Sequence, residues 1–390
     1  YASRGLGDVY KRQNYIFMQQ VIRVISGKSI CILVEVFFIL SFSFLSYKYN
    51  LYIVWGIIPF LFLTKKAIYK NAAFWVVVLT MLSFIYYYSG FGSTFRTIKT
   101  MVVLLPFFFT NVLQREQYCL SKYFYFFMQL NAILVCVDFF LYFIVGRTIM
   151  NFTESGFLPR PCGLLEDSNF FSYLMLIYIY YYKWNYGHYN KLFITSLFLS
   201  GSFSAIISFL ILLSIFKKKF VEEVCRLRFK LIIVLIALVL IAVYDWLAIH
   251  SDVLLMYISD FQMSDLLKVK IASISHRFTT VSNAMSELDS MNEFLFGIGA
   301  GKTKGLSDIG LNLHNSLLQM FLEMGGVLVC VVLLVIFMMI RNLRITKYVI
   351  LFCVILVLGS MMETLYNPLL ALVYFMSFSN IYKWNLKNMI

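Results

Sequence analysis

The stretch Leu311-Asn-Leu-His-Asn-Ser-Leu-Leu-Gln-Met-Phe-Leu-Glu-Met-Gly-Gly326 leads directly into an apolar run from Val327 to Ile340. A long apolar run predicts a membrane-spanning helix, so the polar part of this stretch lies where the chain enters the bilayer. His314 and Asn315 precede the start of the expected span, near residue 320, by one to two helical turns. Histidine is the side chain best able to exchange a proton near neutral pH, so His314 is the first candidate for chemistry.

The whole chain has the composition of a multi-span membrane protein. Its 390 residues are 61% hydrophobic and only 13% charged, whereas a soluble domain carries about 25% charged residues. The apolar residues form blocks separated by short charged links. We therefore expect an all-α polytopic membrane protein with about 12 transmembrane helices. The expected runs are 29–47, 50–64, 72–89, 99–113, 123–145, 169–183, 190–200, 203–216, 230–249, 320–340, 348–361 and 367–382.

The distribution of basic residues predicts how these helices are oriented. The run from Lys191 to Phe216 is either one long span or two short ones that break at Ser200-Gly-Ser202. Two spans put about twice as many Lys and Arg residues on the inner links as on the outer links, as the positive-inside rule requires. One span would put Lys217-Lys218-Lys219 outside. We therefore expect two spans, with both termini cytoplasmic, in a bacterial inner (cytoplasmic) membrane.

This orientation puts two sizeable segments on the outer face, 146–168 and a large periplasmic loop at 250–313. The inner links are too short for a nucleotide-binding domain, so any chemistry faces outward and does not use ATP or sugar nucleotides. Residues 1–13, Tyr1-Ala-Ser-Arg-Gly-Leu-Gly-Asp-Val-Tyr-Lys-Arg-Gln13, lack an initiator Met and resemble translated sequencing adapter. The expected protein is a single integral membrane domain at 14–390.

Composition also argues against several other classes of protein. The net charge of +14 comes from residues at the ends of apolar runs, and no basic stripe alternates with aromatic residues, so nucleic acid is not an expected partner. The seven cysteines have neither CxxC spacing nor a neighbouring His, and acidic residues do not cluster. We therefore expect no metal site, no disulfide framework and no cofactor.

A first candidate binding site is the stretch Arg160-Pro-Cys-Gly163-Leu-Leu-Glu-Asp-Ser-Asn169, just before an apolar run. Pro159 and Pro161 flank the Arg, and Gly163 permits a tight turn. A guanidinium on a stiff turn above a helix N-terminus is suited to binding phosphate. The alternative is an ordinary helix cap at Ser168 or Asn169 beside a solvated Arg.

A second candidate is Ser273-Ile-Ser-His-Arg277, followed by Phe296-Gly-Ile-Gly-Ala-Gly301. The glycines resemble a dinucleotide fingerprint, but no βαβ unit surrounds them. We expect a flexible turn that brings Arg277 near His314, and a surface role for His276. Between the two parts, four apolar positions at helical spacing predict an amphipathic helix: Phe278, Val281, Met285 and Leu288.

Acidic residues also lie within predicted spans, among them Glu323, Glu35 and Asp138. Glu323 follows His314 by two and a half turns, too far for direct contact along one helix. Because an acid inside a span is costly, Glu323 is expected to mark the depth of a polar cavity. Glu35 and Asp138 either pair with basic residues or line the same cavity, and structural pairing is the favoured interpretation.

The order of these elements, over about residues 90 to 380, resembles the O-antigen ligase and polymerase superfamily. The matching residues are Arg160, Gly163 and Asn169 before one span, Arg277 ahead of Gly297-Ile-Gly-Ala-Gly301, and His314-Asn315 followed by Gly325. The chain departs from the family after the seventh span. Members commonly read Ser-Arg there, whereas this chain has Phe203 at the Arg position, which leaves Arg96 or Arg147 to supply a missing cationic contact.

The resemblance implies a metal-independent glycosyltransferase that moves a glycan from undecaprenyl diphosphate to a sugar hydroxyl on the outer face of the membrane. His314 would activate the acceptor hydroxyl, and Arg160 and Arg277 would bind the diphosphate. The supporting residues would be Asn169, Asn315, Glu323 and Arg96.

Three functions are compatible with this resemblance. The favoured one is a polymerase of O-antigen, capsule or exopolysaccharide repeat units. The others are a ligase acting on lipid A core and, in another class, a lipid-linked glycan flippase. Implied partners are the undecaprenyl-diphosphate-linked oligosaccharide, membrane lipids, and a flippase and chain-length regulator of the same pathway.

Overall fold

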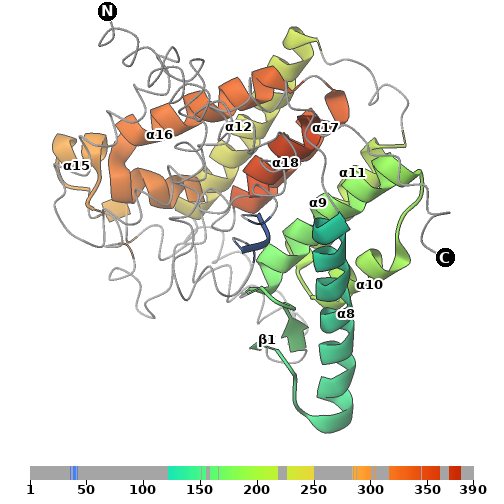
Figure 1. Ribbon diagram of the computed structural model, residues 1–390. Coiled ribbons are helices and arrows are strands. Elements are labelled where there is room, and N and C mark those ends of the chain that lie inside the picture. The colour runs from blue at the N-terminus through green and yellow to red at the C-terminus, as the bar shows by residue number, and fades with distance from the viewer. Residues whose placement is uncertain are drawn as a thin grey trace, which may run out of the picture.

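Helices make up most of the chain that the computed structural model describes (Figure 1). The described residues are 36, 38–40, 42, 122–150, 152–154, 159–165, 167–217, 226–249, 283, 285–286, 288–299, 303, 316–343, 345–360 and 369–378. Their elements are α8 (Lys122–Val145), β1 (Phe152–Glu154), β2 (Pro159–Pro161), α9 (Ser168–Tyr186), α10 (Lys191–Leu199), α11 (Phe203–Ile215), α12 (Leu227–Ile249), α15 (Met291–Phe296), α16 (Ser316–Asn342), α17 (Thr346–Ser360) and α18 (Leu369–Phe378).

Within the described ranges, three helices are long and apolar enough to cross a membrane: Tyr123–Val145, Leu227–Tyr244 and Leu317–Asn342. Large apolar side chains are exposed along them, among them Phe140 and Phe143 on α8 and Leu235 and Leu240 on α12. Such surfaces are unfavourable in water but suit contact with lipid. These helices support the expected membrane protein. Most of the first four expected runs lie outside the described residues, so the count of about 12 spans stays a prediction.

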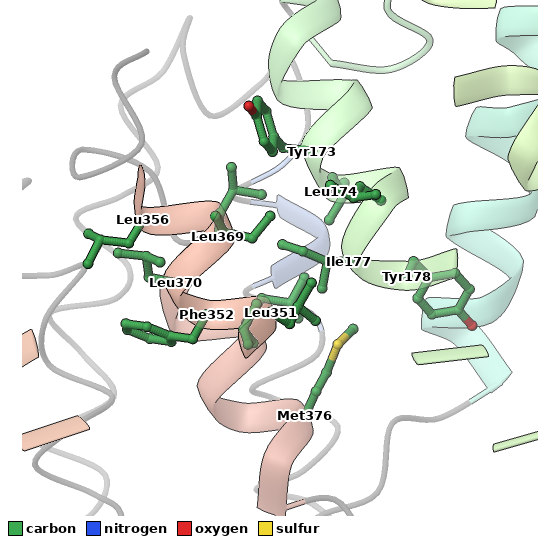
Figure 2. Close-up of a cluster of buried hydrophobic side chains, with 14 of the residues drawn as sticks. Tyr173, Leu174, Ile177, Tyr178, Leu351, Phe352, Leu356, Leu369, Leu370 and Met376 are labelled. Carbon is green, nitrogen blue, oxygen red and sulfur yellow. The ribbon is translucent and has the colours of Figure 1, made fainter. Parts of the chain in front are cut away.

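Helix α9 is the centre of the described bundle. Every residue from Phe171 to Tyr182 is buried, which is the pattern of a helix surrounded by others. Figure 2 shows Leu174 and Ile177 of α9 facing Leu351 of α17 and Leu369 of α18. Because α9 is held on all sides, the residues at its start have a fixed place in the fold.

One end of the bundle is rich in basic side chains. Lys230 Nζ donates to the Arg341 carbonyl oxygen at 2.8 Å, so the start of α12 lies beside the end of α16. Lys347 Nζ lies 5.0 Å from the centre of the Trp184 ring, so the start of α17 lies beside the end of α9. The Trp184 ring also contacts Phe216, at the end of α11, at 5.3 Å. We call this the basic end.

The other end of α9 meets the turn between α10 and α11. Ser172 Oγ and Ser200 Oγ lie 2.6 Å apart, although the residues are far apart in sequence. The chain breaks at Gly201, whose φ of +66° lies in the left-handed region that favours glycine. The predicted break at Ser200–Ser202 is therefore confirmed. However, α10 has only 9 residues, about 14 Å of helix, which is half of a typical hydrocarbon core of about 30 Å.

Candidate functional site

Arg160 lies in the second strand of a short antiparallel hairpin, where it pairs with Thr153. Its Nη2 donates to Asn169 Oδ1 at 2.6 Å. Ser202 Oγ donates to the same oxygen at 3.0 Å. The half-buried Arg160 is thereby held between the start of α9 and the start of α11. The alternative of an Arg that is merely solvated does not fit these bonds. We call Arg160, Asn169, Gly201 and Ser202 the arginine cluster.

Gly201 makes room for the Arg160 side chain. A Cβ atom added at Gly201 would lie 3.3 Å from Arg160 Cγ, so the aliphatic part of Arg160 packs directly on the α10–α11 turn. Nearby Phe203, at the position where the resembled family commonly has Arg, is 70% exposed. Among the described residues, Arg160 brings a cation to this turn from the hairpin.

Asp167 caps helix α9, not Ser168 or Asn169. Its Oδ1 accepts from the Asn169 backbone N–H at 2.6 Å, so the alternative of a cap at Ser168 or Asn169 is wrong. Because Asp167 supplies the cap, the Asn169 side chain is available to orient Arg160. The Asp167 carboxylate also opposes the positive end of the helix dipole. An anion at this site would therefore be attracted by the guanidinium rather than by the helix terminus.

Helix α8 fixes both ends of the segment that carries the hairpin. Asp138 Oδ1 accepts from Ile149 N at 2.8 Å, and its Oδ2 accepts from Met150 N at 3.3 Å. Further along, buried Asn131 accepts from Leu164 N at 2.9 Å through its Oδ1. Asp138 is therefore structural, as favoured, but these bonds go to backbone N–H groups rather than to a basic side chain. Asn131 was not a sequence candidate, because its partner is remote in the chain.

The turn beside Asn131 requires a glycine. Gly163 has φ +60°, and a Cβ atom there would lie 2.9 Å from Asn131 Oδ1. The tight turn expected at Gly163 is confirmed. It allows the chain to pass from β2 to α9 within a few residues, which places Arg160 beside Asn169.

A second group of polar contacts surrounds Glu323, which is only 1% exposed. Its Oε1 accepts hydrogen bonds from Thr303 Oγ1 and from Gln319 Nε2, the latter at 3.1 Å. Thr303 and Gln319 are themselves buried. Glu323 therefore lies in close contact with protein groups, and its expected role in marking the depth of a polar cavity stays a prediction.

Helix α16 is broken two residues after Glu323. Gly325 has φ +78° and ψ 170°, outside the helical region, and Figure 1 shows α16 bent beside α15. The Leu322 carbonyl accepts from Ile298 N at 2.8 Å, and the Glu323 carbonyl accepts from Gly299 N at 3.1 Å. The carbonyl groups that lose their partners within the helix at this break thus accept hydrogen bonds from the segment that follows α15.

Two glycines allow this close backbone approach. A Cβ atom at Gly297 would lie 2.5 Å from the Glu323 carbonyl carbon, and one at Gly325 would overlap the Leu295 carbonyl group. The flexible turn expected at Gly297–Gly299 is therefore a bonded segment of backbone. We call the contact of residues 297–299 and Thr303 with Gln319–Gly325 the α16 junction.

Of the seven residues proposed for the site, the structure describes Arg160, Asn169 and Glu323. It brings the first two into contact and places Glu323 in the α16 junction. The other four, His314, Asn315, Arg277 and Arg96, lie outside the described residues, as do His276 and Glu35. Arg147, the second possible source of a cation, is exposed just after α8. Comparisons of the chain with protein-family models, curated proteins and solved structures found no match.

Replacing Gly201 by Ala is expected to displace Arg160. The left-handed backbone costs about 1 kcal/mol for a residue with a Cβ atom, and the new methyl group presses on Arg160 Cγ. Gly187→Ala is the matched control, because Gly187 has φ +78° but nothing within 4 Å of the added Cβ. Thermal unfolding in detergent should show a similar loss of stability for both. Only Gly201→Ala should reduce the activity proposed below, and equal activity of the two variants would contradict this role for Gly201.

Proposed function

We propose that this chain is a membrane glycosyltransferase that polymerises undecaprenyl-diphosphate-linked repeat units of an O-antigen, capsule or exopolysaccharide. The observation that carries the proposal is the half-buried guanidinium of Arg160, held by the Asn169 amide oxygen at 2.6 Å. An amide oxygen gives a guanidinium a defined orientation, and guanidinium groups bind phosphate oxygens through paired hydrogen bonds.

The position of the arginine cluster supports a lipid-linked donor. The cluster lies where α9 and α11 begin, whereas the basic end lies where these helices finish. The positive-inside rule assigns the basic end to the cytoplasm, which assigns the arginine cluster to the outer side of a bacterial inner membrane. The hairpin that carries Arg160 packs on α8, whose exposed apolar side chains suit contact with the lipid of the donor.

The proposed reaction is a displacement at the anomeric carbon of the donor glycan. The acceptor hydroxyl attacks that carbon and transfers its proton to His314, while the bond from carbon to the diphosphate oxygen breaks. Undecaprenyl diphosphate leaves with the bonding electrons, and its developing charge is stabilised by Arg160 and Arg277. Asn169 orients Arg160, whereas Asn315 and Arg96 contact the substrate. The mechanism needs neither metal nor cofactor.

A flippase of lipid-linked glycans is the second candidate, because transporters often contain broken helices at their binding sites. The break in α16 at Gly325 favours this alternative. A ligase acting on lipid A core would use the same arginine chemistry as the polymerase. A flippase and a chain-length regulator are proposed pathway partners of the polymerase.

The glycan pattern of a deletion strain separates these functions. For a polymerase, the strain retains glycans of one repeat unit, and the wild-type gene restores the full ladder. A His314→Ala protein that inserts normally should leave the single-repeat pattern unchanged, and restoration of the ladder would refute the role of His314. Loss of all attached glycan with accumulation of lipid-linked polymer would identify a ligase. Accumulation of lipid-linked units on the inner leaflet would identify a flippase.

A further inference from the structure

Tyr173, one turn after Asn169 in α9, carries a buried hydroxyl group. Its side chain is 0% exposed, and among the residues that the structure describes no group meets this hydroxyl in hydrogen-bonding geometry. Figure 2 shows the hydroxyl directed away from the other labelled side chains. A buried hydroxyl without a partner lowers the stability of a protein, and such groups are rare in native structures. Folding alone therefore does not account for a hydroxyl group at this position.

The surroundings of this hydroxyl are polar, although they lie inside the bundle. Its nearest polar neighbours include the hydroxyl groups of Ser204 and Ser208 in α11. Ser208 Oγ donates its proton to the Ser204 carbonyl oxygen at 2.7 Å. Ser204 Oγ lies 3.5 Å from Ser202 Oγ, which belongs to the arginine cluster. A strip of hydroxyl groups therefore connects Tyr173 with the arginine cluster.

Helix geometry places Tyr173 on the same face of α9 as Asn169. Residues four apart in a helix share a face and lie about 6 Å apart along the axis. Asn169 Oδ1 accepts from Arg160 Nη2, so the guanidinium and the phenol succeed each other along this face. Arg160 and Ser204 are both half-buried, so the strip reaches the surface of the bundle beside the fully buried Tyr173. A diphosphate bound at Arg160 can extend along this face toward the phenol.

We propose that the Tyr173 hydroxyl is a further donor to the diphosphate of the lipid-linked substrate, next to the phosphate bound by Arg160. This inference rests on the proposed function. A hydrogen bond to a charged phosphate oxygen is stronger than one between neutral groups, and it stabilises the charge that develops on the leaving group. A substrate-dependent bond also accounts for a hydroxyl that the described protein groups leave unsatisfied. Because Tyr173 is fully buried, the contact requires a local rearrangement of the surrounding side chains.

Tyr180 is a matched control in the same helix. It lies about two turns further along α9 and is also 0% exposed, but its hydroxyl donates to the Phe209 carbonyl of α11 at 2.9 Å. Replacing either Tyr by Phe removes one oxygen atom and keeps the ring. Tyr173→Phe should leave the thermal unfolding temperature in detergent unchanged or raise it by about 2 °C, whereas Tyr180→Phe should lower it by about 2 °C.

Binding of undecaprenyl diphosphate to the full chain in lipid nanodiscs tests the contact without reference to polymerisation. Tyr173→Phe should weaken binding about tenfold, which is the loss of one hydrogen bond to a charged group, and Tyr180→Phe should stay within about twofold of wild type. Undecaprenol, which lacks the phosphates, should bind the three proteins alike. Inorganic diphosphate, which lacks the lipid, should show the same relative weakening with Tyr173→Phe.

Polymer formation by the same proteins tests the consequence for catalysis. Tyr173→Phe should lower kcat by about tenfold or more, because the lost bond stabilises charge in the transition state. Tyr180→Phe should keep a rate close to that of wild type. Reduced activity together with retained or increased stability is a combination that a purely structural role for Tyr173 would not produce.

Three results for Tyr173→Phe would overturn the inference. The first is unchanged binding of undecaprenyl diphosphate. The second is a loss of stability like that of Tyr180→Phe, which would show that the hydroxyl is bonded within the folded protein. The third is an equal weakening for undecaprenol, which would assign the effect to packing against the lipid. If the wild-type protein binds undecaprenyl diphosphate but forms no polymer, the proposed function fails, whereas the binding data still decide whether Tyr173 contacts the diphosphate. If the wild-type protein binds none, both fail.

Discussion

Arg160→Lys is expected to reduce polymer formation about 100-fold, in line with the loss of one group that stabilises transition-state charge. Lysine keeps the positive charge but loses the planar fork that binds two phosphate oxygens at once. It also lacks the fixed geometry with which Arg160 Nη2 donates to Asn169 Oδ1. The rate should be measured with membranes that contain equal amounts of inserted protein.

The control for this substitution is Arg228→Lys, an exposed position at the basic end. It makes the same chemical change far from the arginine cluster and should leave the rate unchanged. Normal activity of Arg160→Lys would exclude bidentate binding of the diphosphate by Arg160. A loss confined to Arg160→Lys, with normal insertion, would support it.

Gly325→Ala is expected to have the largest effect on stability. The φ of +78° and ψ of 170° at Gly325 form a region that is almost exclusive to glycine, and occupying it costs other residues about 1–3 kcal/mol. A Cβ atom would also overlap the Leu295 carbonyl and the Phe296 N–H, which are backbone groups with little freedom to move. The substitution should therefore separate the two sides of the α16 junction and lower the thermal unfolding temperature in detergent.

The neighbouring glycine is a matched control. A Cβ atom at Gly326 would approach no atom more closely than 3.5 Å, at the Phe294 carbonyl and the Phe321 ring. Within a helix, Gly→Ala is favourable by up to about 1 kcal/mol. Gly326→Ala should therefore be at least as stable as wild type. Equal unfolding temperatures for the two variants would contradict the close contact at Gly325.

Local sequence patterns were enough to predict some of these features. Long apolar runs indicated helices that cross a membrane, because few soluble helices have that composition. Ser200-Gly201-Ser202 indicated a helix break. Pro159, Pro161 and Gly163 around Arg160 indicated a stiff turn that holds this Arg above the N-terminus of the next helix. Each of these inferences depends on residues that are near one another in sequence.

The remaining features depend on contacts between remote residues. Gly297 approaches Glu323, and Gly325 approaches Leu295, only because α15 packs on α16. The sequence therefore suggested a flexible turn and an unbroken span. Asn131 could not be recognised as a partner of Leu164 for the same reason. Asp167 was missed as the helix cap because Asp, Ser and Asn are adjacent there and cap helices about equally well.

The most direct test of the central claim uses the purified full-length chain in proteoliposomes with a synthetic undecaprenyl-diphosphate-linked repeat unit. Glycan length and released undecaprenyl diphosphate are measured together over time. The proposed polymerase should lengthen the lipid-linked glycan and release one undecaprenyl diphosphate for each bond formed, without added metal or nucleotide. Movement of the intact substrate between leaflets with no elongation and no release would contradict the proposal.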